Sequence, residues 1–249
     1  MSKISPIYKL LNSRSVYTRD KNVIGKNKGK YDSDEWSKTR EINYVFFSNP
    51  SNQNFIDMIS DDQSKISAAQ ELASKFNFLK VNKIGDIGGV PFSQAWTIKN
   101  IYPHLKFYLT DYDRKSIKTF LECSIFQSND FILEKFDAIH DNLDIFDDCD
   151  LLTMWGVDYA LDDSNLLNIF NYLKKNNKKM LLASLNHEND NIFKNTIRII
   201  FNSLESLIGL SRYHGILRNN KYFEYLCNSV GIKLKLVSVT EGYRIYLIN

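Results

Sequence analysis

The sequence predicts an α/β fold: a doubly wound, mainly parallel sheet with helices on both faces and an antiparallel hairpin at its C-terminal edge. The chain has 249 residues, of which 43% are hydrophobic, enough to bury a sizeable core. From residue 63 onward, short apolar runs alternate with amphipathic segments, which is typical of parallel strands joined by right-handed helical crossovers. Near the end, only Glu241 and Gly242 separate two β-rich runs, so these two strands must be antiparallel.

The first predicted elements surround a glycine turn. Residues 64–79 place apolar side chains at helical spacing among good helix formers, so we expect a helix there. Residues 82–89 are expected to form a short strand and a turn. A second helix is expected over 91–103, with Pro91 suited to its first turn. The turn between this strand and helix is where ligands usually bind in such sheets.

The remaining elements continue the alternation. Further strands are expected at 105–113, 131–138, 150–157 and 179–186, with helices at 114–127, 162–175 and 219–231. Asp162, Asp163 or Ser164 can cap the helix at 162–175, and Gly231 stops the last helix. The C-terminal hairpin is expected to pair 232–240 with 243–248.

Two segments do not follow this alternation of strands and helices. Residues 1–62 are polar and irregular, and they are predicted either as an N-terminal extension or lid, or as a solvated linker tied down by its aromatic residues. Residues 63–249 then form the main domain, with a substrate-side insertion near 187–218. Within the insertion, one helical face could cover the substrate pocket or form a dimer surface, although core packing is the preferred reading; it carries Ile197, Ile200, Phe201, Leu204 and Leu207.

Composition narrows the partners. The formal charge of +3 comes from 32 basic and 29 acidic residues, too weak a bias to indicate nucleic acid or a membrane surface. Cys123, Cys149 and Cys227 are far apart and form no CxxC pair, so neither a disulfide framework nor a metal site is predicted. The chain shows no signal peptide and no membrane span, so a cytoplasmic protein is expected.

Acidic residues at the predicted strand tips distinguish between cofactors. Asp86 precedes Gly88 and Gly89, where its carboxylate would repel a pyrophosphate, and the spacing of a G-x-G-x-x-G fingerprint is absent. NAD is therefore disfavoured, and a cationic ligand suits the turn better. Asp111 ends the next strand, 23 positions after Gly88, near the spacing for an acid that accepts from ribose hydroxyls. Asp137 lies at the tip of the third strand.

The ordered set of motifs resembles the class I S-adenosylmethionine-dependent methyltransferases, which have a Rossmann-like fold. "IGDIGG" is similar to their first motif, "LTDYD" to the acidic tip of strand two, and "FDA" to the acid near the adenine. The segment "CDLLTMWGVDYALDDSNLLNIFNYLKK" is similar to their fourth strand and the helix that follows it. The match covers roughly residues 66 to 185, and the C-terminal hairpin agrees with the family's reversed last strand.

The resemblance implies S-adenosylmethionine as cofactor and a role for each motif. The implied cofactor-binding residues are Asp86, Gly88 and Gly89 around the methionine part, Asp111 at the ribose, Asp137 at the adenine edge, Trp155 and Gly156 beneath the sulfonium, and Tyr112, which follows Asp111. Val90 stands where family members usually carry another glycine, which leaves open a narrowed or lost site. Taken singly, these residues have simpler readings: an ordinary turn, helix caps at Asp111 or Asp113, and core packing of Trp155.

The reaction expected is methyl transfer to an oxygen of a saccharide, as in glycan biosynthesis, or of another small molecule. A sugar hydroxyl holds its proton tightly, so a general base or a metal is needed, and His187, Asp158 and Tyr159 are the catalytic candidates. His187 is preferred because imidazole titrates near neutral pH, although a surface histidine capping a helix is an equal alternative. No "[DNS]PP[YF]" segment follows strand four, which argues against amino-methylation of nucleic acid. A non-catalytic, methyltransferase-like module, a nucleotide-sugar or NAD-binding enzyme, and a homodimer are left open.

Overall fold

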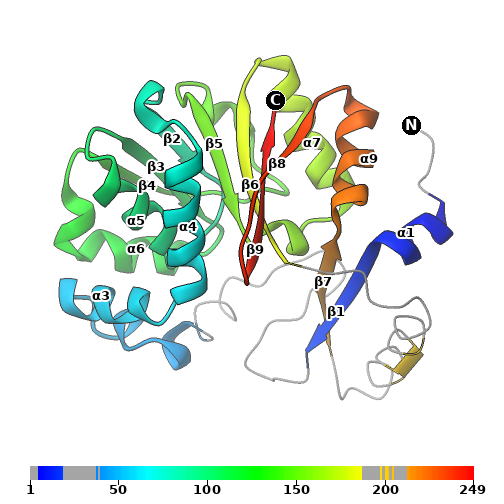
Figure 1. Ribbon diagram of the computed structural model, residues 1–249. Coiled ribbons are helices and arrows are strands. Elements are labelled where there is room, and N and C mark those ends of the chain that lie inside the picture. The colour runs from blue at the N-terminus through cyan, green and yellow to red at the C-terminus, as the bar shows by residue number, and fades with distance from the viewer. Residues whose placement is uncertain are drawn as a thin grey trace.

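The computed structural model describes residues 5–18, 38, 40–186, 197, 200, 201, 204 and 212–249. Within them, a seven-stranded sheet has the order β4-β3-β2-β5-β6-β9-β8, and a two-stranded sheet pairs β1 with β7 (Figure 1). The strands of the main sheet are β2 (Lys83–Asp86), β3 (Lys106–Asp111), β4 (Phe131–Lys135), β5 (Leu151–Trp155), β6 (Lys179–Leu185), β8 (Leu234–Val239) and β9 (Tyr243–Ile248).

The main sheet confirms the predicted fold class. Strands β2 to β6 are mutually parallel, whereas β9 lies antiparallel between β6 and β8. The chain passes outward from β2 through β3 to β4 and then returns to place β5 on the other side of β2. In sheets of this kind, the crevice beyond the carboxyl ends of the strands at this switch point is the usual ligand site.

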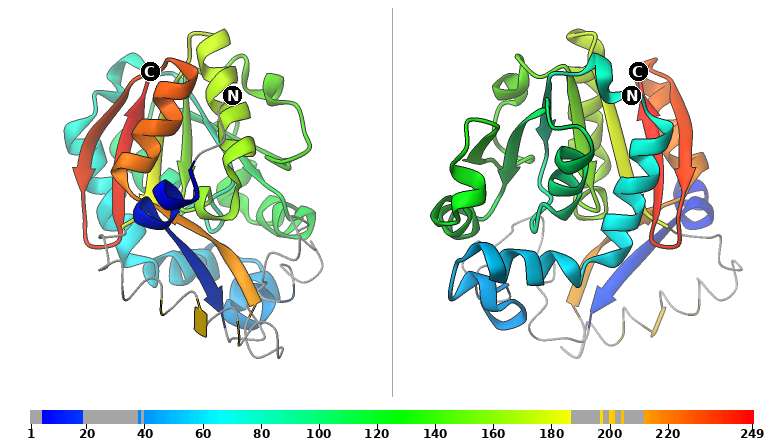
Figure 2. Two further views of the ribbon diagram at one scale, coloured as in Figure 1. Left: turned by 90° about the vertical axis from the view of Figure 1, so that its right-hand side faces the viewer. Right: turned by 60° about the vertical axis from the view of Figure 1, so that its left-hand side comes forward.

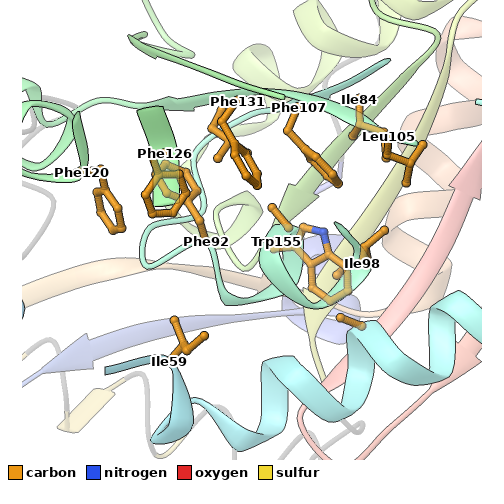
Figure 3. Packing of buried hydrophobic residues seen from close by; sticks show 14 of the residues in the cluster. Ile59, Ile84, Phe92, Ile98, Leu105, Phe107, Phe120, Phe126, Phe131 and Trp155 are labelled. Carbon is orange, nitrogen blue, oxygen red and sulfur yellow. The ribbon is translucent and has the colours of Figure 1, made fainter. Parts of the chain in front are cut away.

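Helices cover both faces of the main sheet (Figure 2). One face packs against α3 (Asn52–Ser60), α4 (Gln63–Lys75), α5 (Ser93–Ile101) and α6 (Arg114–Glu122), and the other against α7 (Asp163–Lys175) and α9 (Asn220–Val230). Along β5 the side chains alternate between the two cores, as strand geometry requires: Leu151 and Trp155 join the first, Leu152 and Met154 the second. Figure 3 shows Trp155 beside Ile98 in the first core.

Several element boundaries differ from the prediction, and the helix expected over 64–79 ends at Lys75. Helix α5 begins at Ser93, because Phe92 takes the N-cap position with a left-handed backbone (φ 62°); the expectation that Pro91 lies in its first turn is therefore wrong. The predicted helix over 114–127 is α6 followed by a separate 3-10 turn, Ser124–Gln127. The predicted cap Asp162 and stop Gly231 are both confirmed.

Short 3-10 turns and one further helix complete the described structure. They are α1 (Pro6–Asn12), η1 (Val45–Phe47), η2 (Phe78–Lys80), η4 (Leu143–Phe146) and η5 (Asp158–Ala160). Phe46 and Phe55, from the predicted extension, are fully buried and pack on Phe120 of α6. The predicted division of the chain at residue 62 stays a prediction.

The small sheet joins two segments that lie far apart in the chain. Strand β1 (Ser13–Thr18) pairs antiparallel with β7 (Arg212–Arg218), which lies at the end of the predicted insertion. Strand β7 approaches η5 so closely that a Cβ added at Gly215 would lie 2.2 Å from the carbonyl oxygen of Tyr159. In Figure 1 the pair lies below the main sheet, at the edge where the parallel strands end.

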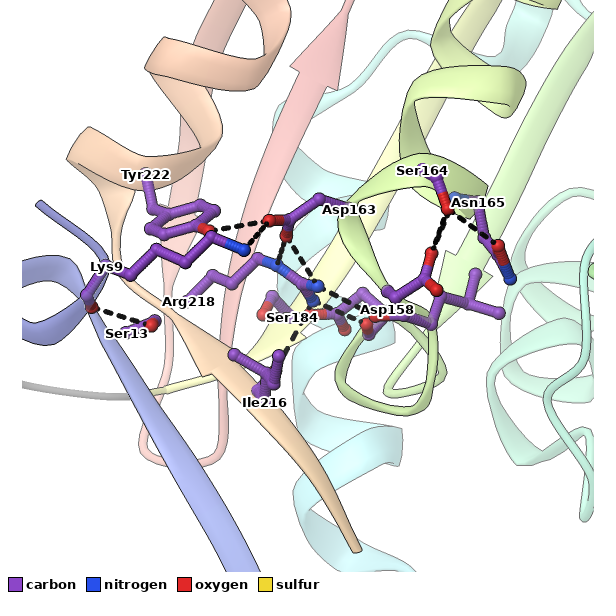
Figure 4. A network of polar contacts seen from close by, with 12 residues as sticks. Lys9, Ser13, Asp158, Asp163, Ser164, Asn165, Ser184, Ile216, Arg218 and Tyr222 are labelled. Carbon is purple, nitrogen blue, oxygen red and sulfur yellow. Dashed lines mark hydrogen bonds and ion pairs between the residues drawn. The ribbon is translucent and has the colours of Figure 1, made fainter. Parts of the chain in front are cut away.

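A buried arginine fastens β7 to the main domain (Figure 4). The side chain of Arg218 is fully buried and pairs with Asp163 at 3.0 Å. Its other N–H groups donate to the carbonyl oxygens of Asp158 (2.8 Å) and Leu161 (2.7 Å). Asp163 also accepts from Lys9 and from the Tyr222 hydroxyl. Although burial acts to raise it, the charges of Arg218 and Lys9 hold the pKa of Asp163 below its usual value.

The apolar helical face predicted near 192–210 is helical where it is described, at Ile197, Ile200, Phe201 and Leu204. These side chains are 39–62% exposed, so the preferred expectation of core packing is wrong for them. Leu207 lies outside the described residues. None of the helices in the described ranges has the length and apolarity to cross a membrane.

Candidate cofactor and active site

A cavity of about 220 Å³ opens at the carboxyl ends of β2, β3, β4 and β5. The segments that follow these strands supply most of its wall, because parallel strands end at one edge of the sheet. The lining residues are Arg40, Lys65, Ile87, Gly88, Gly89, Val90, Asp111, Tyr112, Phe136, Asp137, Ala138, Ile139, Trp155, Gly156, Val157, Tyr159, Ala160, Leu161 and Tyr243. The structure thus brings together seven of the eight predicted cofactor-binding residues.

The glycine turn after β2 has no room for side chains. Gly88 and Gly89 both have positive φ angles, +67° and +126°, which L-residues rarely adopt. A Cβ at Gly88 would lie 2.8 Å from Cγ2 of Val157, and one at Gly89 would lie 2.7 Å from Oδ2 of Asp86. The turn therefore presents bare backbone to the cavity. Val90, the departure from the family pattern, also lines the cavity.

Asp86 is the predicted cofactor residue that does not line the cavity. Its side chain is buried beneath Gly89, accepting from Thr153 Oγ1 at 2.5 Å and Gln94 Nε2 at 2.8 Å. Burial raises the pKa of Asp86 to about 7, against these hydrogen bonds and the charge of Lys65. The expectation that its carboxylate projects into the ligand space is corrected: it supports the turn from below. Its contact with the cofactor stays a prediction.

Asp111 stands at the tip of β3 and faces a guanidinium group. Arg40 donates to both carboxylate oxygens, from Nη1 to Oδ1 at 2.9 Å and from Nη2 to Oδ2 at 3.1 Å. Arg40 also reaches Asp113 Oδ2 at 3.3 Å and Ser116 Oγ at 2.6 Å. Asp113 itself caps α6 by accepting from the backbone of Lys115 and Ser116. Asp113 is therefore a helix cap, as the simpler of the two interpretations predicted, whereas Asp111 lines the cavity.

The wall formed after β4 and β5 is largely apolar. Asp137 lies two residues beyond the end of β4 and is almost buried, with Oδ1 accepting from the backbone N–H of Ile139 at 2.9 Å. The neighbouring lining residues are Phe136, Ala138, Ile139, Val157 and Leu161. This apolar part of the cavity beside Asp137, called the slot below, fits a flat, apolar ring with a polar edge.

The opposite end of the cavity is lined by Lys65, Trp155 and Tyr243. Trp155 is 2% exposed, and its indole Nε1 has no hydrogen-bond partner among the described residues. Tyr243 of β9 packs edge-on against Trp155 and faces Gly156. Lys65 of α4 is also buried, 3.6 Å from Asp62, and burial lowers its pKa despite the nearby carboxylates of Asp62 and Asp86. This end suits a ligand with oxygen acceptors, because Lys65 lines it and carries an ammonium donor group.

The three predicted catalytic residues have different positions. Tyr159 lines the cavity, and burial, together with the charge of Asp158, raises the pKa of its hydroxyl to about 12. Asp158 is fully buried behind the wall, with Oδ2 accepting from Ser184 Oγ at 2.8 Å. His187 lies outside the described residues, as does Glu188. The roles of all three in catalysis stay predictions.

Asp158→Asn should change how stability depends on pH. Burial raises the pKa of Asp158 from 3.8 to about 6, so in this interval the folded chain holds a proton that the unfolded chain has released. The wild type should therefore lose roughly 1–3 kcal/mol of unfolding free energy relative to Asp158→Asn as pH rises from 4 to 7. Urea unfolding of both proteins measures this difference; a constant difference across the interval would contradict the buried, protonated state.

Sequence reasoning missed three cavity residues whose side chains carry a polar or charged group: Arg40, Lys65 and Tyr243. For Lys65 a signal existed, because it shares a helical face with the buried residues Ala68, Ala69 and Leu72. A lysine at such a buried position is unusual unless a partner or a ligand pairs with its ammonium group. Arg40 and Tyr243 are 71 and 132 positions away from Asp111 in the chain, and no local pattern marks them.

Comparisons with known proteins identify the fold. No family model matches the sequence, and no curated protein matches it. Solved structures are similar: human N-acetylserotonin methyltransferase in complex with SAM has a TM-score of 0.58 at 15% identity, over 89% of this chain and 63% of that one. The mitomycin 7-O-methyltransferase MmcR follows with 0.56 at 16%, over 87% and 65%. An O-methyltransferase family protein from Burkholderia thailandensis gives 0.54 at 12%, over 82% and 61%.

The chain therefore has the class I S-adenosylmethionine-dependent methyltransferase fold that the motifs resemble. It spans less than two thirds of the length of each of these three proteins.

Proposed function

We propose that the protein binds S-adenosylmethionine and transfers its methyl group to an oxygen atom of a small molecule. The observation that carries this proposal is the single cavity in which the Gly88-Gly89 turn, the Asp111 carboxylate and the slot around Asp137 lie in family order. Three features suit a nucleoside whose 5′ substituent lies over the turn. They are the bare backbone of the turn, a carboxylate that can accept from the two ribose hydroxyls, and an apolar slot with a polar edge.

The residues of this chain fit each part of the cofactor. Asp111 would accept from the ribose hydroxyls, and the slot with Asp137 would hold the adenine. Lys65 and Trp155 line the other end of the cavity. Lys65 would bind the methionine carboxylate, because its ammonium group supplies hydrogen-bond donors and a positive charge.

When bound, the cofactor supplies a sulfonium-activated methyl group, so the protein has only to align an acceptor and exclude water. The raised pKa of Tyr159 keeps its hydroxyl protonated at neutral pH, so it would donate a hydrogen bond to the acceptor rather than remove a proton. Among the candidates, His187 remains our proposal for the base.

Oxygen is favoured as the acceptor atom because two of the similar structures are described as O-methyltransferases. The saccharide acceptor, the cytoplasmic location and a homodimer remain proposals from the sequence. A non-catalytic module is the less favoured alternative, because seven of the residues predicted to hold the cofactor line one cavity.

Calorimetric titration with S-adenosylmethionine, S-adenosylhomocysteine and NAD tests the proposal. Both sulfur compounds should bind at micromolar concentrations, whereas NAD should not, because the turn lacks the pyrophosphate fingerprint. Absence of binding to both sulfur compounds would refute the proposed function. Binding without methyl transfer to any hydroxylated acceptor tried, in a panel of phenols and saccharides, would support the non-catalytic module instead.

A further inference from the structure

The carboxylate expected to hold the ribose is already occupied by the protein itself. Asp111 accepts two hydrogen bonds from Arg40 and one from the backbone N–H of Asp113. An ionised carboxylate offers about four acceptor positions, so about one remains. A ribose diol needs two. Arg40 and the ribose therefore cannot both satisfy their hydrogen bonds at Asp111.

The arginine holds this position because it neutralises two buried acids. The side chains of Asp111 and Asp113 are only 7% and 1% exposed, and that of Arg40 is 13% exposed. Solvent screens charges of this kind weakly, so an uncompensated pair of carboxylates would be costly. A ribose is neutral and cannot replace the positive charge.

We propose that Arg40 is an internal competitor of the cofactor, so that cofactor binding requires the Arg40–Asp111 ion pair to open. This inference rests on the proposed function. Arg40 belongs to a helical stretch, residues 40–43, that is 71 positions from Asp111 in the chain. The N-terminal segment thus lowers the fraction of molecules that can accept the cofactor. The apparent affinity for the cofactor is the intrinsic affinity multiplied by that fraction.

Arg40→Gln should therefore bind the cofactor more tightly although it removes a polar contact. We expect the dissociation constant for S-adenosylhomocysteine to fall roughly tenfold, the equivalent of one charge-assisted hydrogen-bond pair. Arg40→Lys keeps the charge but loses the two-pronged geometry, so its gain should be smaller. Without cofactor, Arg40→Gln should melt at a lower temperature than the wild type, because two buried acids lose their countercharge.

A matched control loosens the same segment without vacating Asp111. Glu41, adjacent to Arg40, pairs with Lys115, whose side chain is 60% exposed. Lys115→Gln should leave the dissociation constant within about twofold of the wild type, because exposed ion pairs contribute little. If it tightened binding as much as Arg40→Gln does, release of the whole segment, and not of Asp111, would be responsible, and the proposal would be wrong.

5′-Methylthioadenosine separates competition at the ribose from a contact with the methionine carboxylate. It keeps the ribose and lacks the carboxylate, so Arg40→Gln should tighten it by the same factor as S-adenosylhomocysteine. Unchanged or weaker binding of both ligands would overturn the competition, while their binding to the wild type would leave the proposed function standing. If neither wild type nor variant bound either ligand, the proposed function would fail and this inference with it.

Discussion

Asp111→Ala should weaken S-adenosylmethionine binding by about 100-fold. The substitution removes both acceptors for the ribose hydroxyls, and hydrogen bonds to a charged group contribute about 1.5–3 kcal/mol each. Part of this loss is offset, because the same substitution frees Arg40 from its ion pair. The remaining 2–4 kcal/mol or so corresponds to roughly 30- to 1000-fold in the dissociation constant, which calorimetry can measure.

Asp148→Ala is the matched control, because Asp148 is an exposed acid that pairs with Lys83 away from the cavity lining. The Asp148→Ala variant should bind S-adenosylmethionine with the affinity of the wild type. The double variant with Arg40→Gln extends the test: in that background no ion pair is left to release, so Asp111→Ala should cost more than it does alone. Unchanged affinity in Asp111→Ala would remove Asp111 from the ribose site.

Arg218→Met should lower the free energy of unfolding by about 3–5 kcal/mol, the typical cost of breaking a buried ion pair from one side. The variant removes the Arg218 donors to the carbonyl oxygens of Asp158 and Leu161, and it removes one partner of the half-buried Asp163. Urea unfolding monitored by far-ultraviolet circular dichroism measures the loss. Because Arg218 holds η5 at the cavity wall, the folded variant should also bind the cofactor less tightly.

Two comparisons distinguish this network from a general surface effect. Arg218→Lys keeps the charge and loses the fork of donors, so it should cost less than the methionine variant. Lys9→Met removes the half-exposed partner of Asp163 and should cost less than about 1 kcal/mol. A loss below 1 kcal/mol for Arg218→Met would show that β7 is not fastened through this side chain.

Local patterns were enough for the fold because each element depends mainly on its own residues. The apolar period of the strands, the cap at Asp162 and the stop at Gly231 act within a few positions. The hairpin followed from a loop too short for any other connection. At Pro91 the local rule failed, because Phe92 adopts a left-handed backbone and is buried against Phe120.

Much of the cavity could be predicted for a related reason. Gly88, Asp111, Asp137 and Trp155 lie at or just beyond the ends of neighbouring parallel strands, and such ends meet at one edge of the sheet. Strand order alone therefore places residues together that are up to 67 positions apart. The direction of a side chain is not determined by this order, which is why Asp86 lies under the turn and Asp158 lies behind the wall.

The sequence by itself determined the fold class, the strand tips that surround the cavity and the two glycines whose backbone lines it. Only the tertiary structure decided that Arg40 occupies Asp111, that Lys65 and Tyr243 close the other end of the cavity, and that β1 pairs with β7. These contacts join segments far apart in the chain through ion pairs and packing. Their energies depend on burial and geometry in the folded state, and no local period encodes them.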